Sequence, residues 1–183
     1  MALFVAAAAA ALALLGGPGG GRALALNVTD LGGLQWTLSN SRQNVSVEAT
    51  LPGCVHGHLR GAGVLPEDPL RGFNEQAYRW VALEQWTYAA TLVVDEATLA
   101  EEEVSLVLEN VDTFATVELN GENLASLSNS FTRHVVALKP FLRAGANRLR
   151  LRFEPALAHS LAAAASYPYF VPDNSVLIAC RSW

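Results

Sequence analysis

Cysteine and clustered positive charge are both scarce in this 183-residue sequence. Its two cysteines, Cys54 and Cys180, allow at most one disulfide, and their positions alone do not decide between a bridge and a buried free thiol at Cys54. The 12 Lys and Arg are outnumbered by 17 Asp and Glu, which gives a net charge of −5. Without basic blocks the chain lacks the usual electrostatic basis for nucleic-acid binding.

Long apolar runs are also missing, apart from the N-terminus. Residues 2–15 are almost all Ala, Leu, Phe or Val, but a bilayer span needs about 20 such residues. Gly and Pro at 16–21 end the run, and small residues follow near Ala25. We predict that residues 1–25 are a signal peptide and that no membrane anchor remains after cleavage. The alternative is a disordered Ala/Gly leader.

The usual catalytic constellations are absent. The sequence has no Gly-rich phosphate loop, no cluster of metal ligands and no nucleophile elbow. His56 and His58 are two positions apart, as in some metal sites, although histidines at the surface or in packing contacts fit this loop better. We therefore expect no metal, cofactor or catalytic residue in this chain.

Two sequons follow the leader, at Asn27 and Asn44. Together with the signal peptide they predict a glycosylated protein of the secretory pathway.

Short runs of alternating apolar and polar residues dominate the rest. The stretch 104–121 shows two such runs, which we interpret as two strands of one antiparallel sheet, and it ends in Asn120-Gly121, a pair typical of two-residue hairpin turns. With no long helix, the pattern predicts an all-β antiparallel sandwich. The predicted strands are 34–40, after a turn at Gly32-Gly33, and 45–50, 86–94, 104–109, 115–119, 123–127, 131–138 and 147–154. The predicted helical segments are 56–62, a short turn within 95–103, 141–146 and 156–166, and 54–79 is otherwise irregular.

Two groups of side chains allow a functional interpretation. Arg148, Arg150 and Arg152 share one strand face, where they form either an anion site or, more in keeping with their type, a solvated outer face. The aromatic group of Trp80, Trp86 and Tyr88 either stacks on sugars or packs inside the protein.

Six short motifs stand out: Leu-Pro-Gly-Cys-Val-His (51–56), Tyr-Arg-Trp-Val (78–81), Val-Asp-Thr (111–113), Asn-Gly (120–121), Asn-Ser-Phe (129–131) and Leu-Arg-Leu-Arg-Phe (149–153). Together they resemble the N-terminal region of the β-mannosidases of glycoside hydrolase family 2, in register over about residues 31–172. This resemblance implies a jelly-roll, galactose-binding-like β-sandwich over residues 26–172. It also implies a lysosomal, retaining exoglycosidase that removes terminal β-mannose.

In the family both catalytic glutamates lie on a (β/α)₈ barrel that begins beyond residue 183. The resemblance thus implies two partners, the enzyme's own barrel and a β-mannosyl oligosaccharide. Asn74-Glu75 mimics the Asn-Glu pair of the acid/base motif, but we reject it because it lies in an irregular loop.

After Val171-Pro172 the family continues to a Trp-Asp-Trp-Gly-Pro motif that contacts mannose, whereas residues 173–183 read differently. We expect a non-catalytic N-terminal portion whose sandwich lacks its last strands. The alternatives are a stand-alone carbohydrate-binding module and a splice fragment without function.

Overall fold

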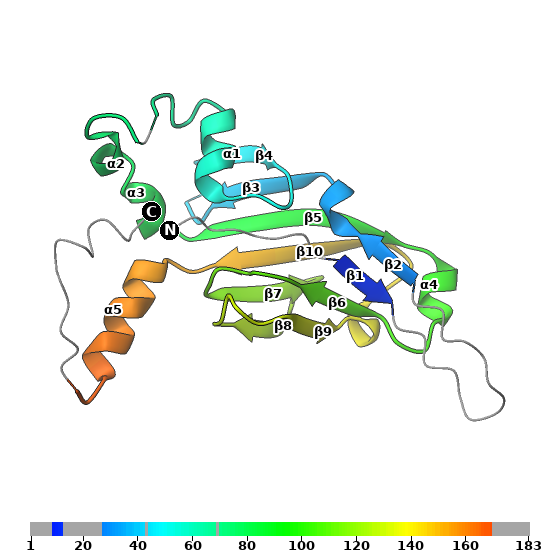
Figure 1. The fold of residues 1–183 in the computed structure, drawn as a ribbon. Helices are drawn as coiled ribbons and strands as arrows, with labels where there is room; N and C mark the ends of the chain where they lie inside the picture. The colour runs from blue at the N-terminus through cyan, green and yellow to red at the C-terminus, as the bar shows by residue number, and fades with distance from the viewer. Residues whose placement is uncertain (1–8, 13–26, 43, 69, 170–183) are drawn as a thin grey trace.

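The computed structural model describes residues 9–12, 27–42, 44–68 and 70–169. Its main element is a six-stranded antiparallel sheet with the strand order β4-β3-β5-β10-β7-β8 (Figure 1). The bounds are β3 (Trp36–Asn40), β4 (Ser46–Ala49), β5 (Trp86–Val94), β7 (Ala115–Leu119), β8 (Glu122–Leu127) and β10 (Gly145–Phe153). The long strands β5 and β10 form its centre, paired over nine residues from Gly145↔Val94 to Phe153↔Trp86.

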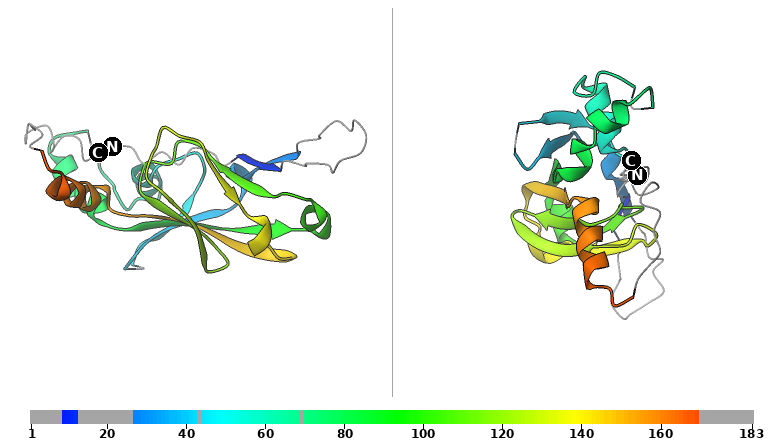
Figure 2. Two further views of the ribbon diagram at one scale, coloured as in Figure 1. Left: turned by 90° about the horizontal axis from the view of Figure 1, so that it is seen from below. Right: turned by 90° about the vertical axis from the view of Figure 1, so that its left-hand side faces the viewer.

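A second, smaller layer covers one face of this sheet (Figures 1 and 2). It contains the antiparallel pair β6 (Ser105–Leu108) and β9 (His134–Ala137). A third pair joins β1 (Ala9–Leu12) to β2 (Asn27–Asp30). The all-β sandwich expected from the sequence is therefore confirmed. Strand β1 falls within the predicted signal peptide, whose cleavage stays a prediction.

The core lies between the two layers, because every second residue of the large sheet faces inward. One buried cluster joins inner-face residues such as Tyr88, Leu151 and Phe153 to Leu106 and Leu108 of β6. Tyr88 and Phe153 meet edge to face, with ring centroids 5.9 Å apart. We expect these contacts to supply most of the stability, at about 1.5–3 kcal/mol for each fully buried large side chain.

One topological expectation is wrong. Strands β6 and β7 do not pair in one sheet: β6 pairs with β9, and β7 lies between β10 and β8. The segment between them carries the chain from one layer to the other, with Asn110 at φ 52° and Val111 fully buried. Alternation fixes which side chains point inward, but it does not say which strand is the neighbour.

The hairpin expectation is confirmed. Asn120 and Gly121 take φ values of 54° and 93° between β7 and β8, as a two-residue turn with two positive φ values requires. The side chain of Asn120 also donates to Phe141 O at 3.0 Å and to Asn147 Oδ1 at 2.9 Å. The turn is thereby tied to the start of β10.

Helical segments surround the sheets. The predicted helices are confirmed at α1 (Val55–Gly61), α4 (Glu96–Ala100) and α5 (Ala156–Ser166). Short helices within or next to the supposedly irregular segment are α2 (Asn74–Ala77) and α3 (Trp80–Leu83). The 3₁₀ helices are η1 (Leu31–Gly33) and η2 (Lys139–Phe141).

The turn expected at Gly32-Gly33 is confirmed as η1, which the Asp30 carboxylate caps by accepting from Gly32 N at 2.8 Å. Two boundaries differ from expectation. The turn expected at 141–146 lies earlier, at η2, and Gly145 opens β10 with φ 83°. Strand β9 begins only at His134, so Phe131 stands in the preceding loop with 96% of its surface exposed.

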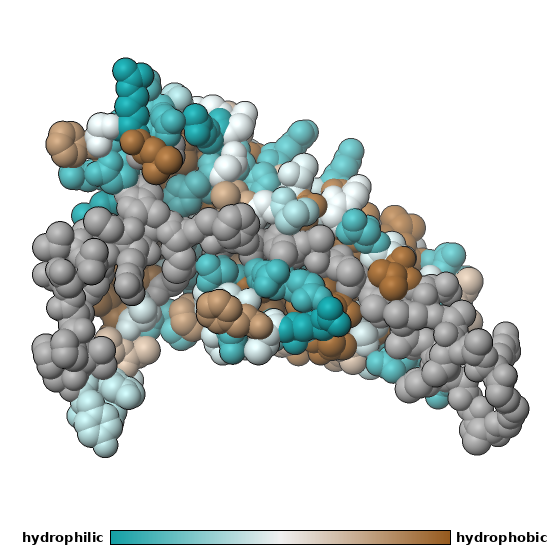
Figure 3. All heavy atoms as spheres, viewed as in Figure 1, coloured by the Kyte–Doolittle hydropathy of each residue, from teal (hydrophilic) through white to brown (hydrophobic). Residues whose placement is uncertain are grey.

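No helix within the described ranges is long and apolar enough to cross a membrane. Exposed apolar side chains occur in separate small groups on the side that carries β6 and β9 (Figure 3).

Candidate functional site

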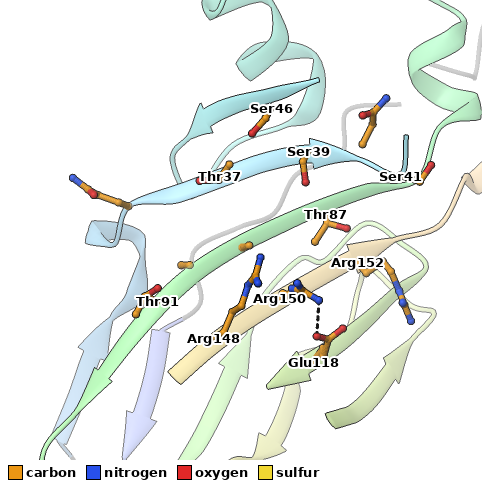
Figure 4. Close-up of a pocket in the computed structure, with 14 residues that line it drawn as sticks. Thr37, Ser39, Ser41, Ser46, Thr87, Thr91, Glu118, Arg148, Arg150 and Arg152 are labelled. Atoms are coloured by element: carbon orange, nitrogen blue, oxygen red, sulfur yellow. Dashed lines mark hydrogen bonds and ion pairs between the residues drawn. The ribbon is translucent and has the colours of Figure 1, made fainter. Parts of the chain in front are cut away.

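A shallow groove of about 790 Å³ lies on the outer face of the six-stranded sheet, away from the core. Its lining is almost entirely polar and comes from β3, β4, β5, β7 and β10 (Figure 4). The labelled side chains are Thr37, Ser39, Ser41, Ser46, Thr87, Thr91, Glu118, Arg148, Arg150 and Arg152. The groove therefore combines hydroxyl groups with an unusual share of the arginines of this acidic chain.

The groove follows from strand alternation. In β10 the residues Leu149, Leu151 and Phe153 point into the core at 0–1% exposure. The arginines between them must point outward, as expected for a strand with a two-residue period. The outer-face expectation for the three arginines is thus confirmed, and the sheet surrounds them with the small polar residues of β3 and β5.

Arg150 is held by an ion pair inside the groove. Its guanidinium donates to Glu118 Oε1 at 2.9 Å across the β10–β7 pairing, where the two residues are direct partners. Both side chains are largely covered, with 33% of Arg150 and 11% of Glu118 exposed. The register of β7 and β8 shifts at Val117/Glu118, beside this pair. Arg150 thus has a structural partner that the sequence alone did not identify.

Arg148 and Arg152 differ from Arg150. Within the described part of the chain no carboxylate lies within 4.0 Å of either guanidinium. Figure 4 shows Arg148 extending toward β5, while Arg150 lies beside Glu118. Three positive charges and one negative charge therefore line the groove.

The aromatic group does not form a sugar-stacking platform. Trp86 and Tyr88 are 3% and 0% exposed on the inner face of β5. The Trp86 indole donates to Val81 O at 2.8 Å, and half-buried Trp80 packs on it with ring centroids 6.0 Å apart. The packing interpretation is therefore the right one, and none of the described residues that line the groove is aromatic.

Gly53 and Cys54 of the Pro-Gly-Cys-Val-His motif, together with His58 two residues after it, hold α1 on the sheet edge. His58 places Nδ1 3.1 Å from the Tyr88 hydroxyl and Nε2 3.0–3.1 Å from the backbone of Thr50. A Cβ at Gly53 would lie 2.5 Å from the His58 ring, so only glycine fits there. Cys54 caps α1, its Sγ accepting from Gly57 N at 3.4 Å. The motif thus has a structural explanation.

The remaining candidate residues, His56, His58 and Glu75, are not arranged as a catalytic or metal site. His58 is engaged as above, burial lowers the pKa of His56, and the described residues contain no group of three metal-ligating side chains. Glu75 lies in the short helix α2 and outside the groove lining. The prediction of a disulfide is untested, because Cys180 is outside the described residues.

The sequons are likewise untested. Exposed Asn44 accepts from Asn40 Nδ2 at 2.5 Å, and Asn27 begins β2. Glycosylation of both asparagines stays a prediction.

One further carboxyl is perturbed. Burial raises the pKa of Asp112, which lies at the crossing between the layers and whose Oδ1 accepts from the Thr113 hydroxyl. A raised pKa is typical of general acids as well as of merely buried carboxyls. Asp112 does not line the groove, so it forms no carboxylate pair with Glu118 there.

The layered strands and the polar outer groove define a galactose-binding-like β-sandwich. A family profile described as "Glycosyl hydrolase 2 galactose-binding domain-like" matches residues 36–182, and the chain belongs to this family. Its homologues include β-mannosidases of Emericella nidulans (40% identity over 66% of this chain), Capra hircus (31% over 76%) and Rattus norvegicus (31% over 68%).

Solved structures agree. A β-D-mannosidase from Dictyoglomus thermophilum superposes with a TM-score of 0.75, 30% identity and 79% coverage of this chain. An exo-chitosanase from Amycolatopsis orientalis, at 19% identity, 67% coverage and a TM-score of 0.59, shares the fold. The match covers 16% of the chitosanase and 18% of the mannosidase. The chain likewise spans only 13–16% of the length of the three β-mannosidases named above.

Proposed function

We propose that this chain is the non-catalytic N-terminal sandwich of a retaining β-mannosidase and does not hydrolyse β-mannosides by itself. In this role it supports a catalytic (β/α)₈ barrel that acts on β-mannosyl oligosaccharides. The homologues and the matching family domain support the assignment to a β-mannosidase.

The observation that carries the non-catalytic role is the single carboxylate of the groove. Retaining glycosidases use two carboxyl groups about 5–5.5 Å apart, one as nucleophile and one as acid/base. Among the described residues that line the groove, Glu118 is the one carboxylate, and it forms an ion pair with Arg150 at 2.9 Å. The described lining therefore lacks the second carboxyl that the retaining mechanism requires.

The test is turnover of an aryl β-mannoside by the purified, folded chain, with the Dictyoglomus thermophilum β-D-mannosidase as the positive control. We expect no release of the aryl alcohol above the buffer rate. Release that tracks the chain through purification and disappears in the Glu118→Gln variant would contradict the proposal.

We also propose passage through the secretory pathway to the lysosome, with glycans on Asn27 and Asn44. The apolar leader and the two sequons support this. Expression in mammalian cells, followed by glycosidase digestion of the wild-type chain and of Asn27→Gln and Asn44→Gln variants, is the test. A product that keeps residues 1–25 and carries no glycan would contradict it.

A further inference from the structure

We propose that the outer-face groove binds an acidic sugar, with Arg148 or Arg152 holding its oxyanion and the hydroxyls of β5 and β3 contacting its polar body. The shared chemistry of such ligands is one phosphate or carboxylate group on a hydroxyl-rich ring. This inference goes beyond the supporting role proposed above and does not depend on it.

Charge is the first argument. The whole chain carries −5, yet the groove lining carries three arginines and one glutamate. Glu118 satisfies Arg150 alone, so Arg148 and Arg152 leave a local excess of positive charge. Glu48 of β4 is the direct partner of Thr37 and lies on the same face, but it is not among the residues that line the groove. Guanidinium groups without a protein partner are suited to bind phosphate or carboxylate through two parallel hydrogen bonds.

The register provides the second argument. Arg148 is the direct partner of Thr91 on β5, and Arg152 is the partner of Thr87. Thr87 is in turn the partner of Ser39 on β3. Each unpaired arginine therefore has a hydroxyl beside it, which is the combination that recognises an anionic group attached to a polyol.

The shape of the groove is the third argument. Ala89 is the β5 partner of Arg150 and leaves room between the two unpaired arginines. Arg152 lies four positions after Arg148 on β10, or about 13 Å along the backbone. Each arginine can therefore hold an anionic group at one end of a monosaccharide or disaccharide that lies along the groove.

The lining also disfavours other ligands. A neutral sugar usually needs an aromatic face on which to stack, and the lining within the described ranges offers none. An apolar peptide would meet a mainly polar surface there. A charged, hydroxyl-rich small molecule matches both the arginines and the hydroxyls.

The experiment is calorimetric titration of the full chain at low salt with glucose 6-phosphate, glucuronate, glucose and inorganic phosphate. We expect one of the two acidic sugars to bind, with the tighter one identifying the anionic group. Glucose and inorganic phosphate should bind at least about tenfold more weakly, because each lacks one half of the contacts. Added salt should weaken the binding of the acidic sugar.

The decisive variant is Arg148→Gln combined with Arg152→Gln. Both residues lie on the outer face, so folding should be retained, and circular dichroism checks this. We expect about tenfold or greater loss of affinity for the acidic sugar. The control is Arg71→Gln, an exposed arginine outside the groove, which should bind as the wild type.

Three results would overturn the proposal. The first is no binding of either acidic sugar, and the second is unchanged binding in the double variant. The third is glucose or inorganic phosphate binding as tightly as the acidic sugars. Because none of these results involves mannoside hydrolysis, the inference can fail while the proposed supporting role stands, and the reverse is also true.

Discussion

The two faces of β10 have the same backbone and opposite roles. Leu149, Leu151 and Phe153 are buried against the smaller layer, whereas Arg148 and Arg152 line an open groove. The inner residues cannot change without leaving a cavity, because protein cores are close-packed. The outer residues face no such restriction. The comparison indicates that one strand can hold the fold with one face and leave the other face free for a ligand.

The largest effect should come from the inner face. Phe153→Ala removes a 1% exposed ring that packs on Tyr88, and we expect a loss of about 3–5 kcal/mol in the free energy of unfolding. Urea denaturation measures this loss. A value below about 1 kcal/mol would mean that the layers are not packed as described.

We expect an intermediate loss of stability when the Arg150–Glu118 ion pair of the outer face is broken. Glu118→Gln should cost about 1–2 kcal/mol. The Arg150–Glu118 pair is less exposed than surface ion pairs, which contribute about 0.2–1 kcal/mol, but it is not fully buried. Its contribution should therefore lie between those of the two kinds of pair. Glu122→Gln, at an exposed glutamate of the next strand, is the control and should stay within about 0.5 kcal/mol. If both variants lowered the free energy of unfolding equally, the ion pair of Glu118 with Arg150 would not contribute to stability.

The smallest effect, that of Tyr88→Phe, should shrink further in alkali. Burial, and then the nearby Cys54 thiol, raise the pKa of Tyr88 above its ordinary value of about 10. The unfolded chain therefore loses this proton first, and the contribution of Tyr88 falls as the pH rises above about 10. Tyr88→Phe should cost about 1 kcal/mol near pH 7, through the lost His58 contact.

The Tyr88→Phe variant should also show a shallower loss of stability than the wild type above pH 10. Urea denaturation at neutral and alkaline pH measures both effects. Tyr167→Phe, at an exposed tyrosine, serves as the control and should follow the wild-type pH profile. If Tyr88→Phe followed that profile as well, Tyr88 would not be buried.

Local pattern accounts for much of this fold. The alternation in β10 predicted both of its faces, and the Asn-Gly pair predicted the turn at Asn120. The chemical character of the predicted site also followed from pattern, because three arginines at every second position had to share a face. These are properties that a few consecutive residues determine through backbone geometry.

Long-range pairing could not be predicted in the same way. The separation of β6 from β7 depends on which strand is the neighbour, and Asn110 turns the chain between layers without a distinctive sequence signal. The partner of Arg150 lies 32 positions earlier, at Glu118, and became evident only from the strand register. The roles of Gly53 and His58 were likewise missed, since their contact depends on how α1 packs on the sheet edge.

The most direct test of the separation between the two faces is to measure unfolding and acidic-sugar binding together on two variants. One carries Leu151→Ala on the inner face, and the other carries Arg148→Gln with Arg152→Gln on the outer face. We predict that the inner variant loses about 2–5 kcal/mol of stability and that the outer double variant loses less than about 1 kcal/mol while its affinity falls. An outer variant as unstable as the inner one, with unchanged affinity, would contradict the account.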